Sequence, residues 1–207
     1  MAKRAFDPRK PAVLLASLAL AGCINFSPLD DLQTATPPAD PFSLALYQNY
    51  TFLAHSFGDV GQSVYTSFDQ DSSIPLTETD VSVATLANTF ANKALALSQG
   101  QVVDPEPSRD ITTHELRDRL VRALTPGRDD FPRDAARAQA DWDCWRLNLL
   151  ASSQRASAER CHQSFNVTLV RLETETAAMD AQKAAEKAKQ KKAEPDKKSE
   201  EDNDETL

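Results

Sequence analysis

Apolar side chains recur at intervals of three and four residues along most of the chain between residues 41 and 179. This interval places them on one face of an α-helix, and stretches rich in Pro, Gly and Ser separate one repeat from the next. No stretch alternates between apolar and polar residues for long enough to predict a strand. We therefore expect an all-α fold, a small helical bundle of about five helices. The predicted helices cover about 41–57, 80–99, 111–124, 132–150 and 158–194.

Local signals mark where these helices begin and end. Asp40 and Asp110 are suited to cap the first turns of two helices, and Pro132 fits the first turn of another. A long polar loop is predicted over 58–77. The predicted helix ends are Gly58, Gly100, the Thr125-Pro126-Gly127 turn and Pro195. The predicted core residues are Phe42, Leu46, Tyr50, Leu53, Phe57, Val83, Leu86, Ala87, Phe90, Ala94, Leu97, Leu116, Leu120, Val121, Leu124, Ala135, Ala138, Trp142, Trp145, Leu149, Cys161, Phe165, Leu169, Leu172 and Met179.

The start of the chain has the pattern of a bacterial export signal. Four basic residues among the first ten precede an apolar run over 12–21. The run is too short to cross the ~30 Å apolar layer of a membrane as a helix, and it fits the central region of a signal peptide. Leu20-Ala21-Gly22-Cys23 matches the lipobox of bacterial lipoproteins. We expect cleavage between Gly22 and Cys23 and attachment of lipid to the Cys23 thiol; the alternative is an ordinary signal peptide with an incidental cysteine.

This prediction divides the chain into four parts. Residues 1–22 are the predicted lipoprotein signal peptide, and 23–40, with three prolines, a flexible tether. Residues 41–179 are the predicted helical domain, and 180–207 a charged tail rich in Lys and Glu. Ile24, rather than Asp, after the cysteine favours the periplasmic face of the outer membrane, and the inner membrane stays open as the alternative.

Charge and glycine content argue against nucleic-acid and phosphate binding, and the lysines of the tail allow a weak contact with an anionic polymer. With 31 acidic and 23 basic residues, the net charge is −8, which is unsuited to nucleic-acid binding. The five glycines are scattered, so a glycine loop that cradles phosphate is not expected. The tail concentrates lysines between Lys183 and Lys198. It is predicted to be a solvated, partly disordered extension; the alternative is a weak electrostatic contact with an anionic envelope polymer such as peptidoglycan.

Two cysteines remain after Cys23, and an exported domain places them in an oxidising compartment. Cys144 lies near the end of one predicted helix and Cys161 near the start of the next, so an antiparallel hairpin can bring them to bridging distance. We predict a Cys144–Cys161 disulfide that staples this C-terminal helical hairpin. The alternative is a zinc site that adds His162, and His114, to both thiolates; no metal-binding spacing supports it, and neither a metal nor another cofactor is predicted.

No catalytic constellation is evident, and we expect the protein not to be an enzyme. None of the histidines lies in a nucleophile motif such as GxSxG. The acidic pairs Asp129-Asp130 and Asp141/Asp143 lie among arginines, so we interpret them as a solvated helix face. Trp142 and Trp145, three residues apart, are predicted core residues rather than a ligand platform.

Three segments resemble the N-terminal helical domain of alphaproteobacterial OmpA-type outer-membrane lipoproteins. They are 91–100 (ANKALALSQG), 103–107 (VDPEP) and 136–145 (ARAQADWDCW), the last with Cys161 downstream. The resemblance covers about 12–175 and implies a helical fold and an outer-membrane location. Family members continue into a peptidoglycan-binding domain, whose alternating strands and Asp/Arg pair we do not find in the tail of this sequence.

Two functions are compatible with these observations. The first is a lipid-anchored outer-membrane lipoprotein that faces the periplasm and has a structural or interaction role in envelope integrity or assembly, with an envelope protein as its unknown partner. The alternative is a helical binding module for a small ligand or peptide, with a groove around Phe42, Tyr50, Phe90 and Trp142. A tightly filled core favours the first function, and an open apolar groove favours the second.

Overall fold

The computed structural model describes the backbone of residues 27–68 and 78–201, and the side chains of 27–59 and 83–192. These residues form six α-helices and a short 3-10 helix, and the described part contains no β-strand, so the all-α prediction is confirmed. The predicted lipidation site at Cys23, the cleavage site after Gly22 and the last residues of the tail lie outside the described ranges. The helices are α1 (Pro28–Asp31), α2 (Pro41–Phe68), α3 (Glu78–Ser98), α4 (Ile111–Asp130), α5 (Pro132–Asn148) and α6 (Arg155–Glu201), with the 3-10 helix at Ser152–Gln154.

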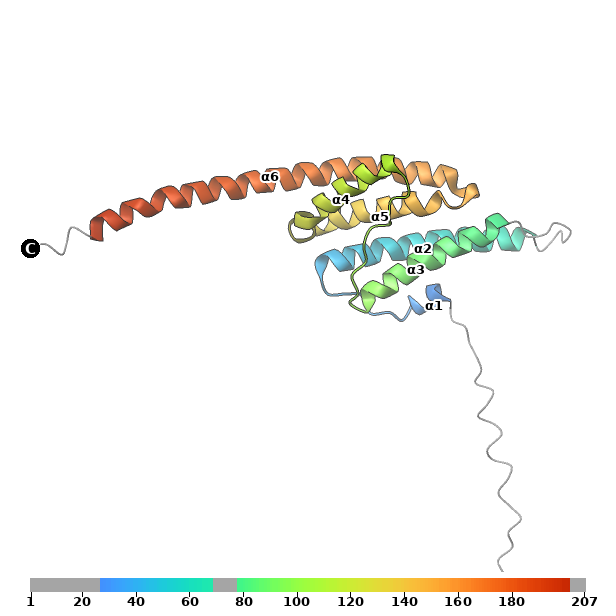
Figure 1. The fold of residues 1–207 in the computed structure, drawn as a ribbon. Coiled ribbons are helices and arrows are strands. Elements are labelled where there is room, and N and C mark those ends of the chain that lie inside the picture. Colours follow the sequence, from blue (N-terminus) through green and yellow to red (C-terminus); the bar gives the residue numbers. More distant parts are fainter. Residues whose placement is uncertain (1–26, 69–77, 202–207) are drawn as a thin grey trace, which may run out of the picture.

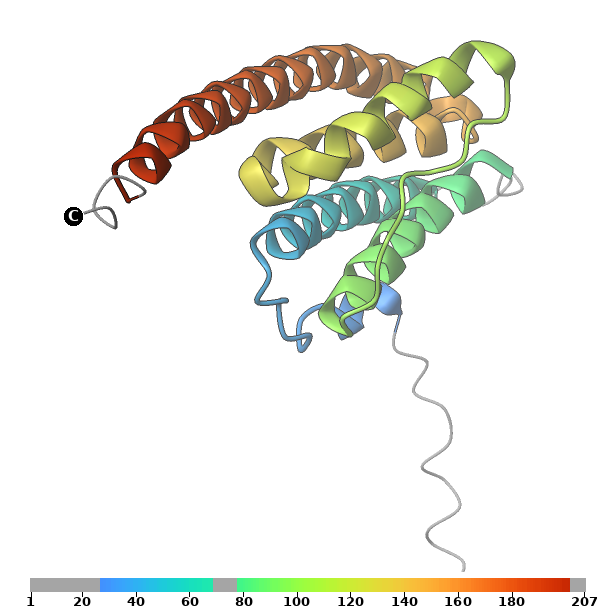
Figure 2. The same ribbon diagram turned by 60° about the vertical axis from the view of Figure 1, so that its left-hand side comes forward.

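The helices form two layers (Figure 1). The antiparallel pair of α2 and α3 makes one layer, and α4, α5 and α6 make the other; α2 packs against α5 between the layers. The short helix α1 lies against α3. A connector, residues 99–110, runs from the end of α3 across the bundle to the start of α4, as the turned view shows (Figure 2). The second half of α6 extends beyond the other helices.

The predicted apolar faces meet in a single core. Residues buried as predicted are Phe42, Leu46, Tyr50, Phe57, Val83, Leu86, Ala87, Phe90, Ala94, Leu97, Leu120, Leu124, Ala135, Ala138, Trp142, Phe165, Leu169 and Leu172. Partly buried members are Leu53, Leu116, Trp145, Cys161 and Met179. Val121 and Leu149 are 40% and 49% exposed, so their prediction is wrong. Leu149 follows the last residue of α5, and the helical spacing therefore no longer places it on the core face.

Four of the predicted helix boundaries are confirmed. The Asp40 carboxylate accepts a hydrogen bond from the Ser43 amide at 2.8 Å at the start of α2, and Asp110 accepts one from the Thr113 amide at 2.9 Å at the start of α4. Pro132 occupies the first turn of α5. Gly100 follows α3 with a φ of 76°, a left-handed conformation that glycine adopts without steric cost.

Two other glycines, predicted to end helices, lie inside them instead. α2 continues through Gly58 to Phe68, and α4 continues through Pro126 and Gly127 to Asp130. Both glycines allow close packing: a Cβ on Gly58 would come within 2.8 Å of Leu29, and one on Gly127 within 2.9 Å of Leu172. Tertiary packing thus outweighs a local helix-breaking preference of about 1 kcal/mol per glycine.

The predicted tether and the predicted stop at Pro195 also differ from the structure. In the described part of the tether, Ser27 caps α1 and Leu32 is buried in the core, so residues 27–40 are attached to the bundle. α6 runs through Pro195 to Glu201, past the predicted end at 194. A proline removes one backbone hydrogen bond, and in a helix that projects from the bundle water can satisfy the carbonyl that it leaves unpaired.

Candidate functional site: the buried cluster around Asp143

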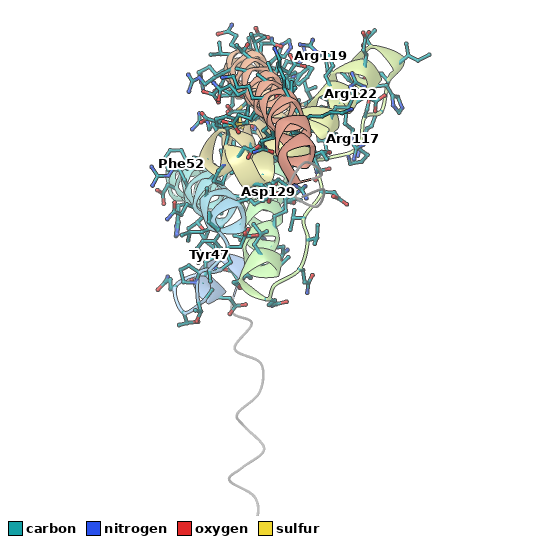
Figure 3. All side chains as sticks on the ribbon, turned by 90° about the vertical axis from the view of Figure 1, so that its left-hand side faces the viewer. Tyr47, Phe52, Arg117, Arg119, Arg122 and Asp129 are labelled. Atoms are coloured by element: carbon teal, nitrogen blue, oxygen red, sulfur yellow. A yellow bond between two sulfur atoms is a disulfide. The ribbon has the colours of Figure 1, made fainter. Side chains whose placement is uncertain are left out.

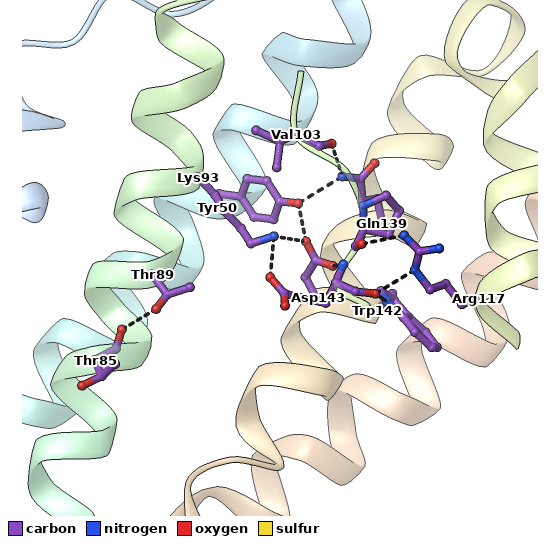
Figure 4. Close-up of polar contacts among 11 residues, drawn as sticks. Tyr50, Thr85, Thr89, Lys93, Val103, Arg117, Gln139, Trp142 and Asp143 are labelled. Atoms are coloured by element: carbon purple, nitrogen blue, oxygen red, sulfur yellow. Dashed lines mark hydrogen bonds and ion pairs between the residues drawn. The ribbon is translucent and has the colours of Figure 1, made fainter. Parts of the chain in front are cut away.

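The three segments on which the family resemblance rests meet at one buried carboxylate, that of Asp143 on α5. Lys93 comes from segment 91–100 on α3, Glu106 from the connector segment 103–107, and Gln139 and Trp142 from the same helix as Asp143 (Figure 4). The Asp143 side chain is 0% exposed. A charge this deeply buried is tolerated only when donors surround it, so its contacts define the cluster.

Asp143 accepts hydrogen bonds from three directions. The Tyr50 hydroxyl on α2 donates at 2.5 Å, the Lys93 ammonium on α3 at 3.1 Å and the Glu106 backbone amide at 2.7 Å. Lys93 also pairs with the Glu106 carboxylate at 2.8 Å, and its ammonium lies 5.6 Å from the centre of the Tyr50 ring. One carboxylate thereby joins both layers and the connector.

The connector has no helix or sheet of its own, and side chains of the cluster satisfy its carbonyls. The Trp142 indole N–H donates to the Glu106 carbonyl at 2.9 Å, and the Gln139 amide donates to the Val103 carbonyl at 2.8 Å. Arg117 of α4 donates to the Glu106 and Pro105 carbonyls at 3.0 and 3.2 Å. Buried backbone groups require such partners, so these side chains fix the path of the connector.

Burial and the charges of neighbouring side chains together set the pKa values of the cluster. Burial raises the pKa of Asp143, and Lys93, the Glu106 amide and the Tyr50 hydroxyl oppose this rise. The pKa of Tyr50 is raised well above 10.0, first by burial and then by the charge of Asp143. Burial alone would lower the pKa of Lys93, but the attraction of Asp143 and Glu106 raises it. Tyr50 therefore stays a donor and Lys93 a cation at neutral pH, as a structural clamp requires.

A second buried carboxylate, Asp141, lies two residues before Asp143 and faces α6. It accepts hydrogen bonds from Arg137 at 3.0 Å, from Ser164 at 2.7 Å and from Thr168 at 3.3 Å. Burial raises the pKa of Asp141, and these partners oppose the rise. The prediction of a solvated face is wrong for Asp141 and Asp143, which are 6% and 0% exposed. It holds for Asp129, which is exposed.

The predicted disulfide between Cys144 and Cys161 is present and joins α5 to α6. Beside it, the Trp145 and His162 rings stack with their centres 3.9 Å apart. The alternative zinc site is set aside because it needs both sulfurs as free thiolates, and His114 is exposed elsewhere, on α4. In the part of the chain that the structure describes, no group of three His, Cys, Asp or Glu side chains is placed to hold a metal ion.

The predicted groove is not formed, because Tyr50, Phe90 and Trp142 are fully buried. Phe42 instead lines a cavity of about 600 Å³ between the start of α2, the end of α3 and the end of α4, together with Pro37, Leu97 and Val102. Arg128 of α4 reaches the same cavity, with its guanidinium 4.8 Å from the centre of the Phe42 ring. Its buried Nε has no hydrogen-bond partner among the described residues.

Sequence reasoning missed Lys93, Glu106, Arg117 and Gln139 as members of a site. The sequence does contain one signal of the cluster. Ala135, Gln139, Asp143 and Leu147 follow one another at intervals of four, so the two polar residues lie on the same buried face of α5 as the two apolar ones. Polar residues on such a face indicate a buried polar cluster. Their partners lie too far away along the chain for a local pattern to show them.

In comparisons with known proteins, no family model, no curated protein and no solved structure matches the chain. Among the described residues, no helix is both long and apolar enough to cross a membrane.

Proposed function

We propose that this protein is a lipid-anchored lipoprotein on the periplasmic face of the outer membrane, where it has a structural or interaction role in the cell envelope. The observation that carries the proposal is the Cys144–Cys161 disulfide, together with the signal peptide and lipobox that the sequence predicts. Disulfides persist in the oxidising periplasm and are rare in the bacterial cytosol. The family resemblance supports the same location.

The Asp143 cluster supports a structural role over a catalytic one. Its carboxylate is fully buried and occupied by three donors, and Lys93 and Tyr50 are turned toward it rather than toward a cavity. The single buried side-chain atom of the cluster without a partner is Gln139 Oε1. Such a network fixes the relative positions of helices and leaves no group poised to act on a substrate.

The second half of α6 supplies the proposed contact with peptidoglycan. Residues 180–192 are all exposed and carry five lysines against Asp180 and Glu186. Lysine ammonium groups bind an anionic polymer as hydrated point charges, so we expect little protein on isolated sacculi at physiological ionic strength. Any binding should fall further as added salt shortens the Debye length from ~10 Å to ~3 Å.

The lipoprotein proposal is tested by processing and sorting in the native host. Wild type should incorporate labelled fatty acid and accumulate as a precursor when lipoprotein signal peptidase is inhibited by globomycin. Cys23→Ala should incorporate no label, because only the thiol accepts the diacylglyceryl group. Ile24→Asp is the matched control: it should still be acylated but shift toward the inner membrane in a sucrose gradient. Acylation of Cys23→Ala would refute the proposal.

The interaction role is tested by identifying partners in crosslinked envelopes. Tagged wild type and Cys23→Ala are recovered from cells crosslinked before lysis, and proteins enriched only with the anchored form are compared. We expect a defined envelope protein to be enriched with the wild type. Equal recovery of the same proteins with both forms would show that anchoring does not determine the partner.

The cavity beside Arg128 favours a second candidate function, the binding of a small ligand. Its apolar lining from Pro37, Phe42 and Leu97 and its half-buried arginine suit a carboxylate attached to an apolar group. Asp40 and Asp129 also line the cavity and oppose an anion there. Decanoate is a suitable probe: binding by calorimetry that is lost in Arg128→Gln and kept in Arg133→Gln supports this function, and no heat with the wild type refutes it for this class of ligand.

A further inference from the structure

α6 has two apolar faces, and the described part of the bundle covers one of them. The inner face consists of Phe165, Leu169, Leu172 and Thr176, all buried. On the opposite side, Val167 and Val170 are 61% and 55% exposed. None of the other described helices lies over this side, as the views along and across α6 show (Figures 1 and 3).

The exposed side continues as a regular stripe beyond the bundle. Its members follow one another at intervals of three and four residues and are all exposed; we call them the outer stripe of α6: Val167, Val170, Thr174, Ala177, Ala181, Ala184 and Ala188. This alternation is the heptad spacing of a helix that packs along another helix. The polar member, Thr174, already donates its hydroxyl hydrogen to the Val170 carbonyl at 2.7 Å, so it can be buried with its donor satisfied.

The sizes of the side chains along the outer stripe favour a second copy of this chain, packed antiparallel against α6. The side chains of the outer stripe are large at Val167 and Val170 and small at the alanines. In an antiparallel pair centred near residue 179, Val170 of one copy faces Ala188 of the other and Thr174 faces Ala184, which keeps the distance between the helices uniform. A parallel pair would place valine on valine at one end and alanine on alanine at the other, and the helices would diverge.

Charge selects the same orientation. Between residues 166 and 180, α6 carries three acidic side chains against Arg171, whereas between 181 and 192 it carries five lysines against Glu186. An antiparallel arrangement lays the basic half of each helix along the acidic half of the other and brings Glu173 near Lys187 of the second copy. A parallel arrangement brings Lys187 of one copy near Lys192 of the other, and the two positive charges repel each other.

We infer that the outer stripe of α6 is the interface of an antiparallel homodimer, with the two bundles on opposite sides of the paired helices. Because each bundle packs on the inner face of its own α6, the second helix meets only the uncovered side. The inference does not depend on the proposed envelope location.

The orientation is tested by cysteine crosslinking of the purified full chain, in which Cys23→Ser removes the free thiol and the Cys144–Cys161 disulfide is left intact. Val170→Cys and Ala188→Cys are prepared separately, mixed and oxidised, and linked peptides are identified by mass spectrometry. An antiparallel dimer gives the 170-to-188 link in the mixture and few links within either variant alone. Links of 170 to 170 and 188 to 188 would show a parallel pair and overturn the inference.

Association itself is tested by sedimentation velocity over a concentration series in a mild non-ionic detergent. The Cys23→Ser chain should sediment as a dimer at high micromolar concentration. Ala181→Glu places two carboxylates near the two-fold axis and should weaken association by about tenfold or more. Gln190→Glu adds the same charge to the same helix on its other side and should leave association unchanged. A Cys23→Ser chain that is monomeric at every concentration, or equal weakening by both variants, would overturn the inference.

Discussion

The middle of α5 and the far half of α6 are both rich in charged residues, yet their surroundings are opposite. Asp141 and Asp143 are buried among donors from four other parts of the chain. In contrast, Lys187, Lys189, Lys191 and Lys192 are exposed on a helix that extends beyond the bundle. A charge in the first region fixes tertiary structure, whereas a charge in the second is available to solvent and to partners. The number of charges in a segment therefore does not show which role they have.

The largest effect is expected at Asp143. Asp143→Ala removes the acceptor of the Tyr50 hydroxyl and of the Glu106 amide and leaves the Lys93 ammonium with the Glu106 carboxylate alone. Loss of one partner of a buried ion pair costs about 3–5 kcal/mol. Urea denaturation should show this loss in the free energy of unfolding.

Two further variants sharpen the comparison. Asp141→Ala should cost less, about 1–3 kcal/mol, because its partner Arg137 is half exposed and can be hydrated. Asp129→Ala, on the surface of α4, should stay within about 0.5 kcal/mol of the wild type. Equal losses for all three variants would show that burial does not set the role of these charges.

The next effect concerns the Cys144–Cys161 disulfide, which ties the buried helix α5 to the near half of α6. The bridge closes a loop with a sequence separation of 17, for which the chain-entropy model gives about 3 kcal/mol. Cys144→Ala with Cys161→Ala should lower the free energy of unfolding by about this amount, and reduction of the wild type should have a similar effect. Thiol counting on the unreduced Cys23→Ser protein should find no free thiol; two free thiols would contradict the bridge.

Tyr50 provides a test of the cluster by pH. Its pKa in the folded protein is raised well above 10.0, by burial and then by Asp143, so the unfolded chain loses the Tyr50 proton first as the pH rises. The contribution of the protonated Tyr50 hydroxyl to the free energy of unfolding is complete below about pH 10. It is lost as the pH rises toward the pKa of Tyr50 in the folded protein. The free energy of unfolding should therefore fall above pH 10, and less steeply in Tyr50→Phe than in the wild type. Parallel curves would show that Tyr50 does not titrate with unfolding.

At neutral pH, Tyr50→Phe should also cost about 1.5–3 kcal/mol, because the hydroxyl donates to a charged acceptor. Tyr47→Phe is the matched control on the same helix, one turn earlier. The Tyr47 ring is buried, but its hydroxyl makes no hydrogen bond among the described residues, so this variant should lose less.

Sequence alone predicted the parts of this fold that depend on local pattern. The apolar faces of α2 and α3, the caps at Asp40 and Asp110 and the disulfide are examples, because each is specified by residues a few positions apart or by a single pair. Gly58 and Gly127 have the same local signal as Gly100. Their roles differ because Leu29 and Leu172 pack against them, and these contacts come from other helices.

The Asp143 cluster could not be predicted in the same way. The partners of Asp143 lie 93, 50 and 37 positions away in the chain, at Tyr50, Lys93 and Glu106. The local pattern of aspartates and arginines predicts a solvated helix face, because it does not show that distant donors pack against the aspartates. The information missing from the local pattern is the tertiary neighbour rather than the helical state.

A smaller effect is expected at the start of α4. Hydrogen bonds from Thr112 and Thr113 lower the pKa of Asp110 from 3.8 to about 2. Because the pKa of Asp110 is lower in the folded protein than in the unfolded chain, the Asp110 carboxylate stabilises the fold at pH values above 3.8. This stabilisation is lost as the pH falls through about 2. Asp110→Asn keeps a capping oxygen but does not titrate. Its melting temperature should be below that of the wild type at pH 5, and the difference should shrink toward pH 2. A difference that stays constant between pH 5 and pH 2 would contradict this prediction.

The smallest effect is expected from removal of residues 181–207. The described part of this segment contributes no buried residue. Between its described residues and another helix, one ion pair joins Lys183 to Asp130 at 2.7 Å, and Lys183 is half exposed. Surface ion pairs contribute little because water competes for both partners. In dilute solution, where association through α6 is negligible, the melting temperature should stay close to that of the wild type. Truncation from residue 169 instead removes Leu169 and Leu172 from the core and should be strongly destabilising. If both truncations lower the melting temperature alike, the far half of α6 belongs to the folded unit, and its lysines have the same structural role as the buried charges of α5.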